Sequence, residues 1–158
     1  MAKASYEFLT GTTGKCIRDM EKGDISHDVE NVIFTSIAAT GVISGVARGS
    51  NQSALAHRFY ETTRTLYPER AKPYLHGEIV GVGLLLQNHF NGEAENNAPL
   101  LELMKTHSMP CCIQDVGVEK TEEMFQTYYE MLCASSAIET EEESIRLKTS
   151  LKYLWGIQ

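Results

Sequence analysis

Two histidines are the residues of this chain whose types and spacing could do chemistry. His57 lies inside an expected helix, in the run Ala54-Leu55-Ala56-His57, and His76 lies at the expected start of the next helix. His76 follows nineteen residues after His57, which is too far for one helix face but suits two antiparallel helices joined by a loop. Two neutral imidazoles brought together in this way would supply two of the three protein ligands of an open zinc or iron site. The leading hypothesis is therefore a metal site.

Both histidines also have an ordinary structural interpretation. A buried histidine is more often a hydrogen-bonded core residue than a ligand. The helix that begins at His76 contains Gly77, Gly81 and Gly83, and each glycine costs about 1 kcal/mol relative to alanine in a helix interior. Such a cost is tolerated where a ligand or a second backbone approaches closely. Tight packing of two helices without any ligand would also explain these glycines.

Two polar side chains stand close to the histidines in sequence. Glu78 could accept a hydrogen bond from a metal-binding histidine, or it could stabilise the first turn of its helix. Tyr60 is three residues beyond His57 and shares its helix face, so it would border the site or make an ordinary aromatic core contact. The remaining histidines are expected to be solvated: His27, His89 and His107.

Composition bounds the class of protein. A chain of 158 residues with 42% hydrophobic and 22% charged residues is expected to form a single globular domain over 1–158. Its net charge of −7 disfavours nucleic acid and anionic membranes as partners. No apolar run approaches the roughly 18 residues of a membrane span, and no signal peptide is recognised. The four cysteines form no CxxC pair, so we expect reduced thiols in a cytoplasmic protein: Cys16, Cys111, Cys112 and Cys133.

Hydrophobic periodicity predicts helices throughout the chain, hence an all-α, multi-helix bundle. Typical N-cap residues stand at Ser26, Thr121 and Thr140, and either Ser50 or Asn51 could cap the helix expected over 51–65. The only possible strand is at 116–118. We expect a chain break near residue 48, a loop from Tyr67-Pro68 and an irregular tail from Tyr153. The expected helices cover residues 2–9, 15–20, 26–44, 51–65, 73–90, 96–106, 121–135 and 140–152.

At the two histidines the chain resembles the metal-dependent (iron-containing) alcohol dehydrogenase superfamily, and most closely its glycerol dehydrogenase branch. The similar segments run from Ser53 to His57 and from Leu75 to Leu84, the second containing His-Gly-Glu. In that family the histidine of an Ala-His pattern and the histidine of His-Gly-Glu bind a catalytic zinc or iron. The resemblance therefore implies that His57 and His76 are metal ligands, with Tyr60, Gly77 and Glu78 around them. It also implies the fold of the family's C-terminal helical domain.

The chain departs from the family pattern in two respects. Tyr60 stands where family members normally have a second histidine near the substrate, which weakens the expectation of a polyol substrate. The family's nucleotide-binding domain, and the acidic residue that is its third metal ligand, would precede Met1, and no GxGxxG element is present. Dehydroquinate synthases and glycerol-1-phosphate dehydrogenases share a similar His-Gly-Glu element, so the motif indicates the superfamily rather than the substrate.

The resemblance implies the C-terminal part of an NAD(P)-linked alcohol or polyol dehydrogenase, in which a metal polarises the alcohol and NAD(P), held by the missing domain, accepts the hydride. With two histidines alone, the isolated chain should hold metal weakly and be inactive. Its partner would be a separate nucleotide-binding chain or further copies of itself. Two alternatives stay open. One is a non-catalytic remnant that acts as a helical interaction or oligomerisation module without metal, and the other is an unrelated helical binding module whose histidines pack a core.

Overall fold

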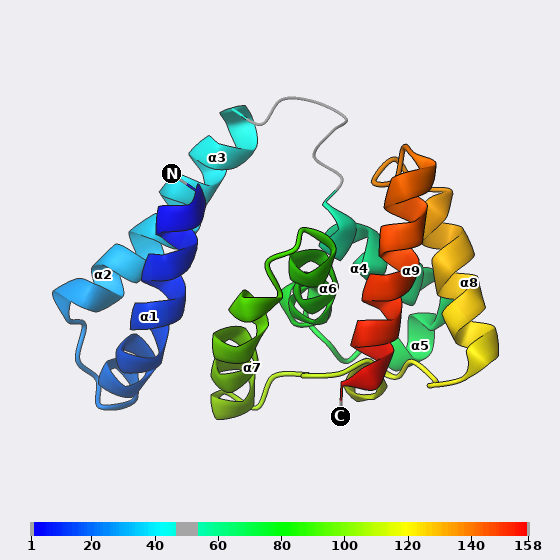
Figure 1. Ribbon diagram of the computed structural model, residues 1–158. Coiled ribbons are helices and arrows are strands. Elements are labelled where there is room, and N and C mark those ends of the chain that lie inside the picture. Colours follow the sequence, from blue (N-terminus) through cyan, green and yellow to red (C-terminus); the bar gives the residue numbers. More distant parts are fainter. Residues whose placement is uncertain (1, 47–53, 158) are drawn as a thin grey trace. The chain divides into compact units, whose positions relative to one another are not determined.

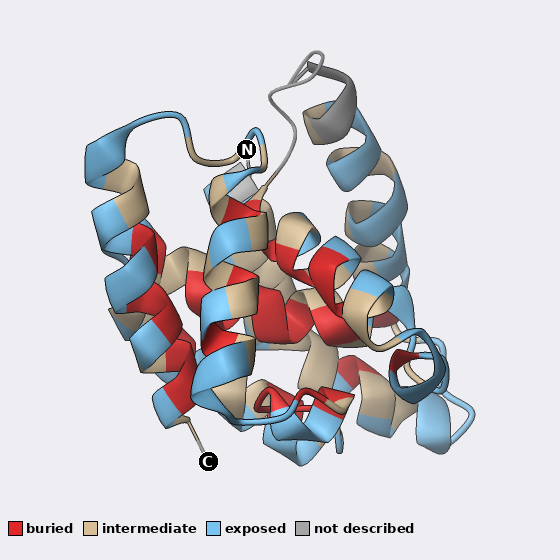
Figure 2. Cartoon of the chain, turned by 90° about the vertical axis from the view of Figure 1, so that its right-hand side faces the viewer, coloured by how far each residue is buried: buried red, intermediate tan, exposed pale blue. Residues whose placement is uncertain are grey.

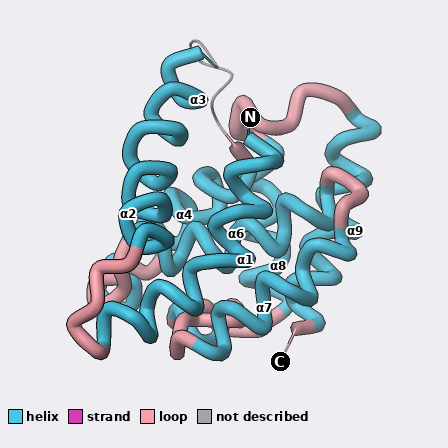
Figure 3. Tube along the Cα trace, turned by 90° about the vertical axis from the view of Figure 1, so that its left-hand side faces the viewer, coloured by secondary structure: helices cyan, strands magenta, loops and turns pink. Residues whose placement is uncertain are grey.

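The computed structural model describes residues 2–46 and 54–157, and all regular structure within them is helical (Figure 3). The all-α expectation is confirmed, and the possible strand at 116–118 is wrong, because Gln114–Val116 (η4) is a 3-10 turn closed by Gly117 at φ +82°. No helix in these ranges is long and apolar enough to cross a lipid bilayer. The chain divides into two compact units, residues 1–52 and 53–158. The single metal-binding domain expected over 1–158 stays a prediction.

The first unit is built on a helix, α1 (Ala2–Glu21), that packs against α2 (His27–Phe34). We predicted two helices here, over 2–9 and 15–20, because Gly11 and Gly14 lie between them. Helix α1 runs through both glycines instead, because a glycine weakens a helix interior without breaking it. The helix ends at Glu21, just before Gly23, the stop that we predicted for the helix over 15–20, and Gly23 takes the left-handed conformation at φ +75°. Its N–H donates to the carbonyl of Met20, a common way of closing a helix C-terminus.

The predicted helix over 26–44 is confirmed in its extent but not in its regularity. It consists of α2, a π-helical segment η1 (Thr35–Ala39) and α3 (Thr40–Val46). Ser26 occupies the N-cap as predicted, although its hydroxyl donates to Asp19 at 3.0 Å instead of capping the helix. Apolar side chains on this helix are exposed: Ile33, Phe34, Ile37 and Val42.

The second unit is arranged around two helices in close contact, α4 (Leu55–Leu66) and α6 (His76–Phe90) (Figure 1). Helices α7 (Asn97–Thr106) and α9 (Glu141–Gly156) pack on α6, and α8 (Glu122–Cys133) packs on both α4 and α9. The short elements are α5 (Pro68–Ala71), η3 (Ala94–Asn96) and η4. Buried residues, red in Figure 2, line the inner sides of the helices. The largest fully buried side chains include Tyr128, Phe59, Ile79, Leu85, Leu86 and Met104.

Several helix ends of the second unit follow local signals that the sequence shows. The hydroxyls of Thr121 and Thr140 accept hydrogen bonds from the backbone N–H groups of Met124 and Glu143, as N-caps do. Helix α6 ends before Gly92, which has φ +78°. The predicted helix starts after Thr121 and Thr140, and the predicted ends near Phe90 and Thr106, are confirmed. The predicted start at residue 73 is wrong, because α6 begins at His76.

Other boundaries differ from the predictions. The predicted loop from Tyr67-Pro68 contains α5, with Pro68 at its first position, where no backbone N–H is needed. The predicted irregular tail from Tyr153 is wrong, because α9 continues to Gly156 and buries Leu154 and Trp155 in the core. Helix α4 begins after Ala54, whereas the expected break near residue 48 and the expected caps at 50 and 51 lie outside the described residues.

Candidate metal site on helices α4 and α6

The site rests on the close approach of α4 and α6. Gly83 of α6 lies directly against the backbone of Ala56, the residue that precedes His57. One turn further on, the side-chain oxygen of Gln87 accepts a hydrogen bond of 3.1 Å from the N–H of Ala56. These two contacts fix the first turn of α4 against the middle of α6. Of the glycines that suggested either close packing or a ligand, Gly83 serves the packing of two backbones.

The structure brings the two histidines together. The ring centroids of His57 and His76 are 5.3 Å apart, with the rings tilted by 48°. Both residues are exposed, so the pair lies on the surface. Metal–nitrogen bonds of about 2.0–2.1 Å in tetrahedral geometry place two coordinating imidazole centroids roughly 5 Å apart. The separation suits a shared cation, and it also falls in the range of about 4.5–7 Å found for ordinary ring pairs.

Tyr60 borders this pair. Its ring centroid is 4.3 Å from that of His76, and the two rings meet edge to face at 65°. Tyr60 is therefore in contact with His76 across the α4–α6 interface, while His57 approaches the same ring from one turn earlier on α4. The three rings form one cluster on the surface of the second unit.

Glu78 and Gly77 are placed around the start of α6. A carboxylate oxygen of Glu78 accepts a hydrogen bond of 2.6 Å from the backbone N–H of Leu75, the N-cap residue. Two roles were considered for Glu78, and this hydrogen bond corresponds to the second of them, in which the carboxylate stabilises the first turn of its helix. Gly77 is exposed, and a β-carbon on it would meet nothing within 4 Å. No close approach of a second backbone or of a side chain among the described residues therefore requires a glycine at position 77.

Among the residues that the structure describes, no third metal ligand accompanies the two histidines. Within 2–46 and 54–157, no group of three or more histidine, cysteine, aspartate or glutamate side chains could hold a metal ion together. The donor chemistry of His57 and His76 fits zinc or iron, but a catalytic site of this kind has three protein ligands. The remaining ligand would have to come from outside these ranges.

His89 is not the solvated residue that the sequence predicts. Its ring stacks on Tyr153 at a centroid distance of 4.4 Å, and its Nδ1 lies 2.9 Å from the buried hydroxyl of Ser150. Both partners lie on α9, about sixty residues further along the chain. No local signal could have found them, because the contact depends on how α6 and α9 pack.

Two further histidines have contrasting environments. His27 is exposed as predicted, and its Nδ1 lies 3.4 Å from a carboxylate oxygen of Glu30. His107 is half-buried rather than solvated, and its Nε2 is buried with no hydrogen-bond partner among the residues that the structure describes. Neither residue belongs to the ring cluster at α4 and α6.

The cysteines agree with the prediction of reduced thiols. All four are free, and Cys111 and Cys112 are both buried. A carboxylate oxygen of Asp115 accepts hydrogen bonds from both of their backbone N–H groups, which orders this turn. Burial, followed by the nearby charge of Asp115, raises the pKa of the Cys111 thiol. A raised pKa disfavours the reactive thiolate, which favours a structural role for this cysteine.

Comparison with known proteins does not assign the chain. No protein-family model matches it, and no curated protein is significantly similar to it. A functional interpretation therefore depends on the two short sequence segments and on the geometry of the ring cluster.

Proposed function

We propose that this chain is the helical part of a metal-dependent alcohol dehydrogenase of the iron-containing superfamily, in which His57 and His76 are two of the ligands of a divalent zinc or iron ion. The observation that supports the proposal is the 5.3 Å separation of the two rings, which belong to histidines nineteen residues apart in sequence on two different helices. The Ala-His and His-Gly-Glu segments that suggested these ligands occupy the facing parts of α4 and α6.

The residues of the chain have distinct tasks in this proposal. Gly83 and Ala56 hold α4 and α6 at the distance that lets the rings meet. Tyr60 packs against His76 and restricts the orientation of that ring. Glu78 fixes the first turn of α6, from which His76 projects. These contacts preorganise two ligands on rigid helices, which is what a metal site requires.

When bound, the metal would supply Lewis acidity toward an alcohol hydroxyl. The chain contributes neither a nucleotide-binding element nor a third ligand within its described residues. NAD(P) would therefore be bound by a separate nucleotide-binding domain or chain, which would also provide the missing carboxylate. We expect the chain alone to bind metal weakly and to lack dehydrogenase activity.

Metal titration of the purified chain tests the proposal. Cobalt(II) can replace zinc and reports nitrogen coordination through its visible absorption. We expect saturable binding of one ion per chain, weakened about tenfold or more in His57→Ala and in His76→Ala, because each removes one of two ligands. His27→Ala is the matched control, since His27 is exposed on the other unit and should leave the titration unchanged.

Two outcomes would contradict the proposal. Equal cobalt binding by the parent chain and by both alanine variants at α4 and α6 would show that the ring cluster is not a metal site. Glycerol oxidation with NAD by the chain alone, well above that of His76→Ala, would show that no separate nucleotide-binding part is needed.

A helical interaction module without metal is the second candidate. One observation favours it: the His57 and His76 rings are also at a normal distance for an aromatic contact, and Tyr60 packs edge-on against His76 in the same cluster. In this case the alanine variants at His57 and His76 would lower the free energy of unfolding without changing metal binding.

A further inference from the structure

A concave site lies between α8 and α9, on the second unit. This cavity has a volume of about 430 Å³, which is within the range of small-molecule sites. None of its lining residues belongs to the ring cluster of His57, Tyr60 and His76. It is lined by Glu122, Phe125, Lys148, Lys152, Trp155 and Gly156.

The floor of the cavity is aromatic and rigid. Phe125 and Trp155 are almost fully buried, and their rings meet edge to face at a centroid distance of 5.7 Å and an angle of 89°. Trp155 is also packed against the buried ring of Tyr128 at 5.3 Å. Only a small part of each residue is exposed, 5% of Phe125 and 8% of Trp155, and contact of an apolar group with that part removes apolar area from water on both partners.

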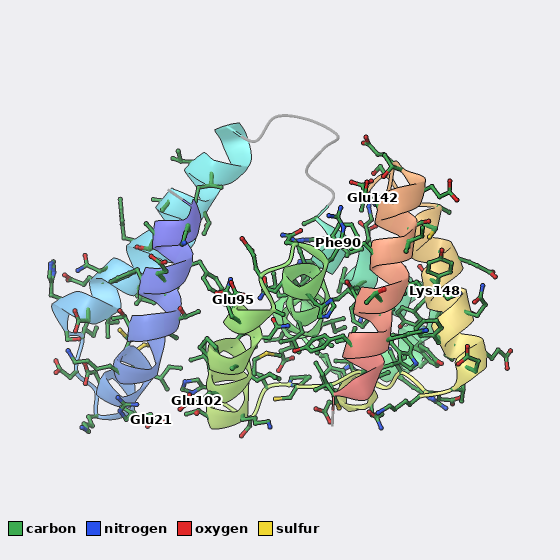
Figure 4. The ribbon with its side chains drawn as sticks, viewed as in Figure 1. Glu21, Phe90, Glu95, Glu102, Glu142 and Lys148 are labelled. Atoms are coloured by element: carbon green, nitrogen blue, oxygen red, sulfur yellow. The ribbon has the colours of Figure 1, made fainter. Side chains whose placement is uncertain are left out.

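The wall on α9 carries two positive charges. Lys148 and Lys152 are exposed and stand one helical turn apart, so their ammonium groups repel each other. Figure 4 labels Lys148 on α9, where its Nζ lies 5.5 Å from the ring centroid of Tyr129 on α8. Neither lysine forms an ion pair in the part of the chain that the structure describes.

The one acidic residue of the lining does not cancel this charge. Glu122 is the first residue of α8, where the positive end of the helix dipole already compensates a carboxylate. The cavity therefore carries a net positive charge in a protein whose overall net charge is −7. An anion bound there would relieve the repulsion between the lysines.

Trp155 also carries a buried polar atom, the N–H of its indole ring. Its Nε1 is buried and has no hydrogen-bond acceptor within 2–46 and 54–157. A buried donor without an acceptor is uncommon and costs free energy. This nitrogen is enclosed by the protein, so a ligand in the cavity would meet the ring of Trp155 and not its N–H.

From these features we infer that the α8–α9 cavity binds a small aryl carboxylate, with the ring of the ligand on Phe125 and Trp155 and its carboxylate facing Lys148 and Lys152. A neutral aromatic molecule would gain only the apolar contact, and an inorganic anion would gain only the charge. For a ligand of this size, partly open to water, we expect a Kd of about 1 mM.

Calorimetric titration of the full chain with sodium phenylacetate, at constant ionic strength, measures this binding. We expect one saturable site, with neutral phenylacetamide binding at least about fivefold more weakly, because it lacks the charge. Lys148→Gln and Lys152→Gln should each weaken phenylacetate binding about two- to fivefold, and the double variant about tenfold. Lys72→Gln makes the same charge change at an exposed lysine outside the cavity and should have no effect.

The fluorescence of Trp155 locates the ligand, because it is the only tryptophan of the chain. Phenylacetate should change its emission with the same midpoint as the calorimetric titration. The inference is overturned if phenylacetate gives no saturable heat, if phenylacetamide binds equally well, if the double variant binds like the parent, or if saturation leaves the emission unchanged. Both lysines are exposed, so their replacement should preserve the fold, which the circular dichroism of each variant checks.

Discussion

A β-carbon on Gly83 would lie 2.6 Å from the carbonyl oxygen of Ala56 and 2.9 Å from its Cα. These atoms belong to the backbone of α4 and cannot move out of the way as a flexible side chain can. The contact therefore sets the distance between α4 and α6, and with it the distance between the rings of His57 and His76.

Gly83→Ala should push the two helices apart. We expect a loss of about 1–3 kcal/mol in the free energy of unfolding, which is typical of overpacking a core. If the two histidines form a metal site, the same change should also weaken cobalt binding. Urea unfolding and cobalt titration of the variant measure the two effects.

The other two glycines of α6 serve as controls, because an added β-carbon would make fewer close contacts at Gly81 than at Gly83 and none at Gly77. A β-carbon on Gly81 would be 3.4 Å from the terminal methyl carbon of Met104, an ordinary contact, and one on Gly77 would meet nothing within 4 Å. Gly81→Ala should be nearly neutral, and Gly77→Ala should be neutral or stabilise by up to about 1 kcal/mol. Equal effects at all three positions would show that helix propensity, not the approach of α4, determines the result.

Tyr60 offers a way to complete the ligand set. Its ring lies 4.3 Å from that of His76, so Tyr60→His would place a third imidazole in the cluster. Because open zinc sites use three protein ligands, we expect cobalt to bind about tenfold more tightly or better. Cobalt titration followed by visible absorption measures the change.

The same substitution in a His76→Ala background is the control. That double variant has two imidazoles, His57 and the introduced one, on a single helix face, so it shows what a pair on α4 can do alone. A gain of equal size in both backgrounds would mean that His76 takes no part in binding, and the proposed α4–α6 site would then be wrong.

A buried hydrogen bond between α4 and α8 supports another prediction. The hydroxyl of Tyr128 donates to the hydroxyl oxygen of Thr63 at 2.9 Å, and both residues are fully buried. Burial raises the pKa of the Tyr128 phenol, so the group stays neutral and acts as a donor. Thr63 in turn donates to the carbonyl of Phe59 at 2.8 Å.

The two ends of this bond should respond unequally to mutation. Tyr128→Phe leaves Thr63 with its bond to Phe59 and should cost about 1 kcal/mol. Thr63→Val leaves the buried hydroxyl of Tyr128 without an acceptor and should cost about 1–3 kcal/mol. Urea unfolding of both variants and of the double variant compares them. A larger loss for Tyr128→Phe than for Thr63→Val would contradict the assigned donor and acceptor roles.

Local signals explain which parts of the fold could be predicted. Thr121, Thr140 and Gly92 mark helix ends through bonds and backbone angles that involve residues within one turn, so the sequence around them is sufficient. The same reasoning placed wrong helix ends at Gly11 and Gly14, because their cost is small compared with the stability of a helix of 20 residues.

Long-range packing explains what could not be predicted. The spacing of His57 and His76 indicated two facing helices, and their rings do lie close together, but the spacing alone could not show that both are exposed. The contact of His89 with Ser150 and Tyr153, and the cavity between α8 and α9, depend on residues far apart in sequence. No local pattern specifies such contacts.

The start of α9 makes one part of the stability depend on pH. A carboxylate oxygen of Glu143 accepts hydrogen bonds from the backbone N–H groups of Glu139, at 2.8 Å, and Thr140, at 3.1 Å. These bonds, the one from Glu139 above all, lower the pKa of Glu143 in the folded chain. A group whose pKa is lower in the folded state stabilises the fold above its unfolded pKa, and this stability is lost as the pH falls through the folded pKa.

Glu143→Gln should therefore lower the Tm at neutral pH and have little effect in acid. Glutamine can still accept a hydrogen bond at this position, so the lost contribution is that of the negative charge. The difference in Tm between the parent chain and Glu143→Gln should shrink as the pH falls below about 4.3, the ordinary pKa of glutamate, and vanish below the lowered pKa. Thermal unfolding followed by circular dichroism from neutral pH downward measures it. Glu142→Gln removes a charge from the same first turn, where the described structure has neither these hydrogen bonds nor the ion pair of Glu143 with Arg146, so its difference should be smaller. A Glu143→Gln difference that persists in acid would show that packing, not the carboxylate charge, stabilises this end of α9.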